Sequence, residues 1–374
     1  MAQDLTEAAR DTGVPAFDAG GPLPPPSGSE LFAALDLGTN SCRMLIATPE
    51  GGQFRVVDAF AKCVRLGSGL ERPGYISRGA LSRTLSALGV CAEKLRRHQV
   101  QNMRLVATEA CRRARNGNRF LAAVARETGL RLEVIRPDEE ARLAVISCAP
   151  LVAPAAEQVL VFDIGGGSTE LVWIDLTQVP PHERAQAIVN LRMQGDTPGG
   201  ARIVDFISVP LGVATLHEHY ADVTDDGARF ALMSWLFEEQ ITGFKPYLED
   251  LANRLDAANF QMIGTSGTVT TVGAAHLGLR RYDRRKVDGM HLSTQAIEEV
   301  IARFLRLGPE GRRNDIGLGR DRSELIMSGV AILQTLLRIW PTASMRVADR
   351  GLREGMLFSM MSAKGAFADG VRLE

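Results

Sequence analysis

Three short segments of this chain combine glycine with aspartate, asparagine or hydroxyl residues, a composition typical of loops that bind phosphate. Asp36-Leu-Gly-Thr-Asn-Ser41, Asp163-Ile-Gly-Gly-Gly-Ser-Thr169 and Gly264-Thr-Ser-Gly-Thr268 each follow an apolar run. Glycine allows close approach of the backbone to a ligand, and N–H groups and hydroxyls supply donors for phosphate oxygens. The predicted phosphate-binding residues are Gly38, Thr39, Asn40, Ser41, Gly165, Gly166, Gly167, Ser168, Thr169, Gly264, Thr265, Ser266, Gly267 and Thr268.

Each segment also has a simpler interpretation: a polar hairpin, a flexible turn and a capped helix start, respectively. Three consecutive glycines in the second segment cost roughly 1 kcal/mol each relative to alanine, which favours a close approach to a ligand. That segment lacks the lysine of a P-loop, so a Walker site is excluded. An aspartate at a strand end suits Mg²⁺, held directly or through water, and we predict Asp163 and Asp36 as metal ligands.

The elements that must position these segments alternate between strands and helices. Apolar runs predict strands at 31–35, 42–47 and 54–60, and again at 159–162, 170–175 and 202–209. Each set begins with a strand that ends on an aspartate and turns through glycine and hydroxyl residues. This weak internal repeat predicts an α/β fold of two similar domains whose loops face each other across a central cleft.

Hydrophobic periodicity and turn residues place the remaining elements. Helices are expected at 78–97, 118–128, from 139 onward, and at 228–255, 294–307, 321–339 and 352–362; strands are expected at 103–108, 131–135, 259–264 and 345–349. Residues 1–30 are expected to be a disordered tail, 31–150 domain I and 157–358 domain II, with a final helix at about 359–374 packing back on domain I. The insertion at 177–201 is expected to be an elongated, partly mobile hairpin loop.

Composition excludes several classes of function. The 43 Lys+Arg and 44 Asp+Glu residues give a net charge of −1, so no global basic excess favours nucleic acid or a membrane surface. We find no apolar run long enough to span a membrane and no secretory signal. The five scattered cysteines and the spacing of His217 and His219 argue against a disulfide framework or a zinc site, and predict a cytoplasmic protein.

Residues 31–362 resemble the exopolyphosphatase/guanosine pentaphosphate phosphohydrolase family, which belongs to the actin, Hsp70 and sugar-kinase (ribonuclease H-like) superfold. The resemblance rests on the segments AALDLGTNSCRMLIA, DEEARL, VFDIGGGSTELV, GTSGT and VADRGLREGML, in matching order and spacing. It implies a short, two-domain member that cuts inorganic polyphosphate from its end with Mg²⁺. The alternative substrate is the 5′-phosphate of guanosine pentaphosphate, and the loops do not distinguish the two.

The same resemblance implies catalytic residues. Glu140, the second glutamate of DEEARL, matches the family's catalytic base, although acidic residues here also suit a helix start. Arg112 matches an arginine that contacts the terminal phosphate, with a solvated basic loop as the alternative. From its position immediately after the glycine loop, Glu170 is expected as a second catalytic carboxylate and a metal ligand, near the metal or the attacking water.

Other possibilities remain open. The Asp36 loop is also consistent with an actin-like or sugar-kinase ATPase. A non-catalytic phosphate sensor is a third alternative, but the presence of Glu140, Asp163 and Glu170 argues against it. The basic run at 280–286 is either a distal polyphosphate site or a solvated face. A homodimer is one alternative for the assembly state.

Overall fold

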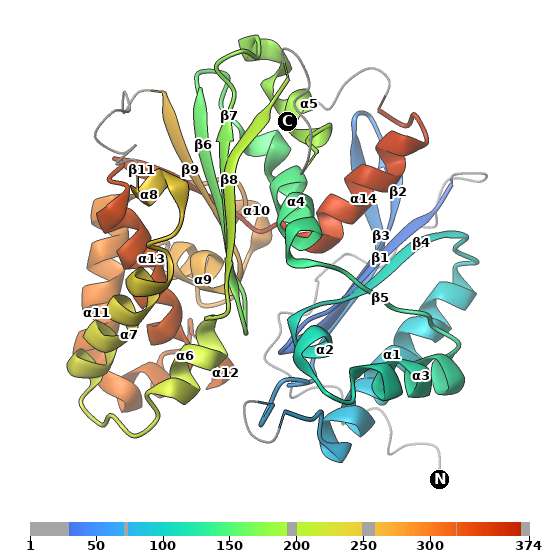
Figure 1. The fold of residues 1–374 in the computed structure, drawn as a ribbon, viewed down its shortest axis with the longest axis horizontal. Helices are drawn as coiled ribbons and strands as arrows, with labels where there is room; N and C mark the ends of the chain where they lie inside the picture. The colour runs from blue at the N-terminus through green and yellow to red at the C-terminus, as the bar shows by residue number, and fades with distance from the viewer. Residues whose placement is uncertain (1–29, 71–73, 193–199, 249–258, 319, 368–374) are drawn as a thin grey trace.

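The computed structural model describes residues 30–70, 74–192, 200–248, 259–318 and 320–367, and the structural statements below concern these ranges. Two mixed β-sheets lie side by side, with helices on the outer faces and between them (Figure 1). None of the helices in the described ranges is long and apolar enough to cross a bilayer.

The first sheet has five strands in the order β3-β2-β1-β4-β5. Its strands are β1 (Phe32–Leu37), β2 (Ser41–Glu50), β3 (Gln53–Cys63), β4 (Asn102–Ala107) and β5 (Glu133–Val134). β1 runs antiparallel to β2 and parallel to β4. β5 is shorter than predicted, because only Glu133 and Val134 come into register with Val106 and Ala107 of β4.

The second sheet repeats this topology. Its order is β10-β11-β9-β6-β7-β8, and its strands are β6 (Gln158–Ile164), β7 (Thr169–Asp175), β8 (Arg202–Val209), β9 (Phe260–Thr265), β10 (His291–Ser293) and β11 (Ser344–Ala348). β6 is antiparallel to β7 and parallel to β9, as β1 is to β2 and β4. The predicted α/β fold, with a repeated unit beginning at each Asp-ended strand, is confirmed.

Helices cover both faces of each sheet. They are α1 (Arg78–Arg97), α2 (Glu109–Arg113), α3 (Gly117–Thr128), α4 (Pro137–Cys148), α5 (Arg184–Val189), α6 (Val213–His219), α7 (Asp226–Gln240), α8 (Lys245–Leu248), α9 (Gly267–His276), α10 (Arg284–Val287), α11 (Thr294–Asn314), α12 (Arg320–Ser323), α13 (Ile326–Ile339) and α14 (Leu352–Ala363). Two 3₁₀ turns are η1 (Ala149–Leu151) and η2 (Pro181–Glu183). Local signals set several ends: Ser77 caps α1 by accepting from the Ala80 amide, and Gly129 ends α3 with a φ of 73°.

Two helices lie between the sheets, and each packs on the sheet that it does not follow (Figure 1). α4 follows β5 of the first sheet and packs on β6, β7 and β8 of the second. α14 follows β11 of the second sheet and packs on β1 and β2 of the first. The two helices also pack on each other, so closely that a Cβ on Gly355 of α14 would overlap the Leu143 carbonyl oxygen of α4. These exchanged helices join the two halves of the molecule.

Five predicted elements differ from the structure. The 177–201 insertion contains η2 and α5, which bury Ile188 and Val189 against the second sheet. The helix predicted at 228–255 ends at Gln240 and is followed by the short α8, while 249–258 lies outside the described residues. α11 runs past 307 to Asn314 but is kinked at Gly308, which precedes Pro309. The helix predicted at 321–339 is two helices, α12 and α13, and Gly329 lies inside α13.

The final helix begins at Leu352. Residues 352–358, assigned to domain II from the sequence, therefore pack on the first sheet.

Candidate active site

The two Asp-ended strands turn through hairpins of the same geometry. In loop 1 (residues 38–41), the Gly38 amide donates to the Ser41 carbonyl at 2.9 Å. In loop 2 (residues 165–168), the Gly165 amide donates to the Ser168 carbonyl, also at 2.9 Å. The repeat seen in the sequence is therefore a repeat of local hydrogen bonding as well as of strand order.

Loops 1 and 2 face each other and are in contact. A Cβ on Gly166 would lie 3.6 Å from the Asn40 Cβ, and one on Gly167 would lie 3.0 Å from the Thr39 hydroxyl oxygen. Gly212, at the start of α6, supports loop 2 from behind: a Cβ there would meet backbone atoms of Gly165, Gly166 and Gly167 at 2.5–2.7 Å. Glycine at these positions thus allows the two loops to approach each other and α6 to approach loop 2.

Strand register brings charged side chains together beside the loops. In the second hairpin Asp163 lies directly opposite Glu170, and in the first hairpin Asp36 lies directly opposite Arg43. Residues opposite each other in an antiparallel pair point to the same face. Each hairpin therefore presents one aspartate together with one further charged residue on the same face.

Glu140, on the first turn of α4, joins these carboxylates. Its side chain is 17% exposed, and its pKa is raised to about 7 by desolvation, against the opposing charge of Arg112 and with further contributions from Asp36 and Asp163. α4 begins at Pro137, and the exchange of α4 onto the second sheet carries Glu140 to the place where both hairpins end.

The other carboxylates of the cluster are perturbed in the same direction. Burial, with the charge of Asp36, raises the pKa of Asp163 to about 6, and burial raises the pKa of Asp36. Burial, with the charges of Glu140 and Asp163, holds the pKa of Glu170 well above its ordinary value, although Ser208 donates to its Oε1 at 2.9 Å. We call Asp36, Glu140, Asp163 and Glu170 the carboxylate cluster. Glu170 is buried and the other three are partly buried. A group of desolvated acids with raised pKa values is typical of a functional site.

Arg112, on α2, contacts the carboxylate cluster from one side. Its Nη1 donates to Glu140 Oε2 and to the Ile135 carbonyl, both at 2.8 Å. Its Nε and Nη2 donate to Glu109 Oε2 at 3.1 and 2.9 Å. Arg112 contacts Oε2 of Glu140, and among the described residues no donor bonds to Oε1, so this oxygen is available to a water.

The carboxylate cluster fits Mg²⁺ in the manner in which Mg²⁺ usually binds. Within the described ranges, no three His, Cys, Asp or Glu side chains are arranged to chelate an ion by themselves. Mg²⁺, however, is commonly held by one or two carboxylates, with waters and substrate phosphates completing its shell. Asp36 and Asp163 supply one carboxylate each from the two strand ends, and a cation beside them would offset their raised pKa values. Their role as Mg²⁺ ligands stays a prediction.

The third predicted segment contributes less to this region than its sequence suggests. Gly264 lies inside the sheet, where a Cβ would clash with Phe162 and Met345, and the Thr268 hydroxyl lies against Gly329 of α13. Thr265 hydrogen-bonds Asp163, which lies beside it in the sheet. Ser266 has a φ of 113°, an unusual conformation for a non-glycine residue, and its hydroxyl is buried with no partner among the described residues. Thr169, the first residue of β7 after loop 2, donates its hydroxyl to the Leu211 carbonyl at 2.7 Å.

The basic run at 280–286 divides in the structure. Arg280, Arg281, Arg285 and Lys286 are exposed. Arg284 instead donates to the Asp349 carbonyl at 2.6 Å and to Glu354 Oε1 at 3.3 Å. A uniform basic surface is thus not formed, because Arg284 is held by acids at the start of α14.

Three charged residues near the carboxylate cluster were missed at the sequence level. Arg43 and Arg353 both act on Asp36 electrostatically, and Glu109 holds Arg112. Arg43 could have been found from the hairpin, because its spacing from Asp36 places it directly across the strands. Arg353 and Glu109 gave no such signal, since α14 and α2 reach the region only through tertiary packing.

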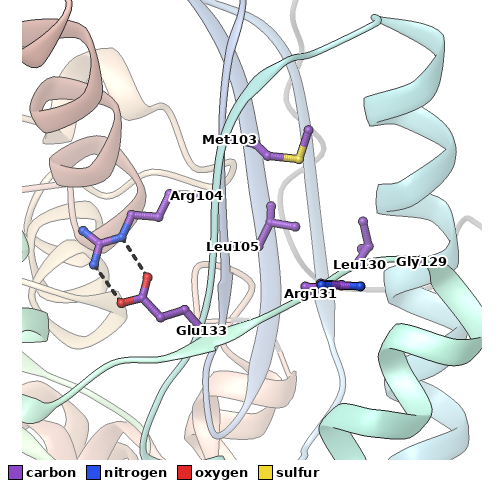
Figure 2. Close-up of a pocket in the computed structure, with 7 residues that line it drawn as sticks. All are labelled: Met103, Arg104, Leu105, Gly129, Leu130, Arg131 and Glu133. Atoms are coloured by element: carbon purple, nitrogen blue, oxygen red, sulfur yellow. Dashed lines mark hydrogen bonds and ion pairs between the residues drawn. The ribbon is translucent and has the colours of Figure 1, made fainter.

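A shallow pocket elsewhere is separate from this region. It lies at the outer edge of the first sheet, with a volume of about 390 Å³, and is lined by Met103, Arg104, Leu105, Gly129, Leu130, Arg131 and Glu133. Figure 2 shows Arg104 of β4 and Glu133 of β5 paired there, with an Nε–Oε2 distance of 3.2 Å. None of the carboxylate cluster lines it.

Comparison with known proteins agrees with the two-hairpin architecture. The model of the Ppx/GppA phosphatase family matches residues 45–364. A guanosine-5′-triphosphate,3′-diphosphate pyrophosphatase of Aeromonas salmonicida is 29% identical over 335 residues, which are 89% of this chain but 60% of that protein's length. The crystal structure of the Aquifex aeolicus Ppx/GppA family member is 26% identical with a TM-score of 0.70, covering 90% of this chain and 98% of that one. The structure of an exopolyphosphatase-like protein is also 26% identical, with a TM-score of 0.72 over 89% of this chain and 99% of that one.

Proposed function

Because the chain belongs to the Ppx/GppA phosphatase family, we propose that it hydrolyses a terminal phosphoanhydride bond, with guanosine pentaphosphate as its substrate. The observation that carries the proposal is Glu140, whose Oε2 is held by Arg112 while Oε1 stays available beside two facing glycine loops. The chain spans 60% of the length of the curated relatives that it matches, so their activity supports the proposal by analogy.

The proposed reaction assigns a role to each group. Loops 1 and 2 bind the substrate phosphates through backbone N–H groups and hydroxyls. Glu140 orients a water and accepts its proton as the water oxygen bonds to the terminal phosphorus. The bond from that phosphorus to the bridging oxygen breaks, which releases orthophosphate. Arg112 balances the charge of Glu140. Asp36 and Asp163 would hold Mg²⁺, which would supply positive charge to offset that of the phosphate oxygens.

Two substrates are consistent with this chemistry. Guanosine pentaphosphate is supported by the names of the Aeromonas relatives, and sequence analysis had placed inorganic polyphosphate first. Polyphosphate is retained as the second candidate because the exopolyphosphatase-like neighbour has an identity in the same range. We also propose a cytoplasmic location, since all five cysteines are free thiols.

The test is phosphate release from guanosine pentaphosphate, polyphosphate and ATP, measured with one preparation, with Mg²⁺ and with EDTA. We expect Mg²⁺-dependent release that is fastest from guanosine pentaphosphate. Glu140→Gln should lower kcat at least about a hundredfold, the usual scale for a positioned base. Faster release from polyphosphate would reverse the order of the two substrates, and release from ATP alone would favour an ATPase. Wild-type kcat in Glu140→Gln would remove Glu140 from the mechanism.

A further inference from the structure

The environment of Arg112 contains a second carboxylate for which the proposed reaction has no role. Glu109, the first residue of α2, is as well buried as Arg112: their side chains are 14% and 15% exposed. Because α2 begins directly after β4, Glu109 lies at the same end of the first sheet as loop 1. The side chain also reaches the second half of the molecule, where a Cβ on Gly167 of loop 2 would lie 3.5 Å from Glu109 Cγ. Glu109 therefore lies within the proposed site.

The hydrogen bonds of Arg112 are almost fully used. A guanidinium has five N–H donors. Two of them, on Nε and Nη2, go to Glu109, and the two on Nη1 go to Ile135 and Glu140. The fifth donor is the second N–H group of Nη2. In this arrangement the Nε/Nη2 edge of the guanidinium, one of the two edges that can grip a carboxylate with two parallel bonds, faces Glu109. Glu140 is contacted through one N–H group, on Nη1.

We propose that Glu109 is a positioning residue, which turns the Arg112 guanidinium so that a single N–H group holds Glu140 Oε2 and leaves Oε1 free for the water. This inference rests on the proposed function. Without Glu109, the paired N–H groups of Arg112 are free to grip both oxygens of Glu140, the preferred geometry of an arginine–carboxylate pair. Glu140 would then orient water poorly, although the loops that bind phosphate would be unchanged.

Kinetics of substituted proteins separate this role from a structural one. We expect Glu109→Ala to lower kcat by about tenfold, on the scale of one lost charge-assisted hydrogen bond, with KM nearly unchanged. Glu109→Gln should recover most of kcat, because its amide oxygen can still accept from Arg112. In an Arg112→Met protein, Glu109→Ala should lower kcat no further. Glu133→Ala, which breaks the Glu133–Arg104 pair on the same sheet, is the matched control and should keep wild-type kcat.

A second readout does not depend on turnover. In ¹⁵N NMR, the slowly exchanging Nε–H resonance of Arg112 should be present in the wild-type protein and in Glu133→Ala, and lost in Glu109→Ala. The proposal is overturned if that resonance survives in Glu109→Ala. It is equally overturned if Glu109→Ala lowers kcat as much with Met at position 112 as with Arg. If the wild-type protein releases no phosphate from any substrate, the proposed function fails, and the resonance still decides whether Glu109 positions Arg112.

Discussion

Glu140 illustrates how burial and neighbouring charge adapt one carboxylate to base chemistry. Its pKa of about 7 lies far above that of a solvated glutamate, because burial and the nearby aspartates outweigh Arg112. A base with a pKa near neutrality combines a useful fraction of the ionised form with a strong tendency to accept a proton. The acids around Glu140 thus contribute to its reactivity as well as to metal binding.

The pH dependence of kcat/KM follows from this pKa. Glu140 must be ionised to act as the base, so kcat/KM should rise about tenfold per unit as pH increases toward about 7 and level off above it. Arg112→Met should move the midpoint to higher pH, because the positive charge that opposes the rise in pKa is removed. A pH–rate profile of both proteins checks this. A flat profile between about pH 5 and 8 would contradict the assignment of Glu140.

Asp163 should lower the stability of the protein while serving its function. Burial raises its folded-state pKa from 3.8 to about 6. The resulting loss of stability is therefore absent below the ordinary pKa, grows as pH rises from that value to the folded-state pKa, and is complete above it. Two pKa units correspond to about 3 kcal/mol as an upper limit. Asp163→Asn should therefore be more stable than the wild-type protein at pH 8 in EDTA, with a smaller difference at pH 5, and less active with Mg²⁺.

A control residue on the same sheet should respond with the opposite sign. Asp175 has a lowered pKa: burial opposes the shift, and hydrogen bonds from Thr177, with the Arg202 ion pair, outweigh it. Asp175→Asn should consequently lose stability at pH 8. Denaturant unfolding of both variants at the two pH values measures the contrast. Equal losses in both would show that the charge of Asp163 is not the destabilising feature.

At the level of elements, the site depends on two hairpins that glycine allows to lie close together. Loop 2 is held between loop 1 and the start of α6, with Gly212 against its backbone. Gly212 has an ordinary φ of −125°, so its requirement for glycine is one of space and not of backbone conformation.

Gly212→Ala tests this packing. The added Cβ would overlap backbone atoms of loop 2, which cannot move aside as a flexible side chain can. We expect a loss of about 1–3 kcal/mol of stability, the usual cost of overpacking, and a raised KM because loop 2 is displaced. Gly89→Ala is the matched control: Gly89 lies exposed in α1 with no neighbour near its Cβ, so alanine should stabilise by about 0.5–1 kcal/mol. Denaturant unfolding measures the stability of both variants, and steady-state kinetics measure their KM. An unchanged KM in Gly212→Ala would argue that loop 2 keeps its position without close packing against Gly212.

At the scale of the whole molecule, the exchange of α4 and α14 between the sheets makes the carboxylate cluster possible. Asp36 belongs to the first sheet, Asp163 and Glu170 to the second, and Glu140 to a helix that connects them. The position of Glu140 relative to the hairpins therefore depends on the crossing of α4 with α14.

Gly355→Ala should disturb that crossing. Its Cβ would overlap the Leu143 carbonyl, and neither helix can yield without moving its backbone. We expect a loss of about 3 kcal/mol or more in stability, together with a fall in kcat, because the helix that carries Glu140 must shift. Thermal unfolding and phosphate release measure the two effects. If the variant keeps both wild-type stability and wild-type kcat, then α4 and α14 can move apart without loss, and their crossing does not determine the position of Glu140.

Local sequence was sufficient for much of this protein. Helix α1 was predicted with its observed ends, and both Asp-ended hairpins were found, because apolar runs, glycines and capping residues act within a few neighbouring residues. The likeness of the two hairpins also predicted that their loops would face each other. Glu140 itself was named through a family motif, since acids at a helix start have a common structural explanation.

Only the tertiary structure decided which of these residues meet. Thr169 and Thr268 belong to segments with the composition of phosphate-binding loops. In the structure, however, the Thr169 hydroxyl donates to the Leu211 carbonyl and the Thr268 hydroxyl packs against Gly329 of α13. Arg284 belongs to a basic run, yet α14 brings Glu354 to it. Glu109 and Glu140 are joined through Arg112 because β4, α2 and α4 converge from distant parts of the chain. Side-chain direction and charge partners depend on contacts between distant segments, which local composition does not encode.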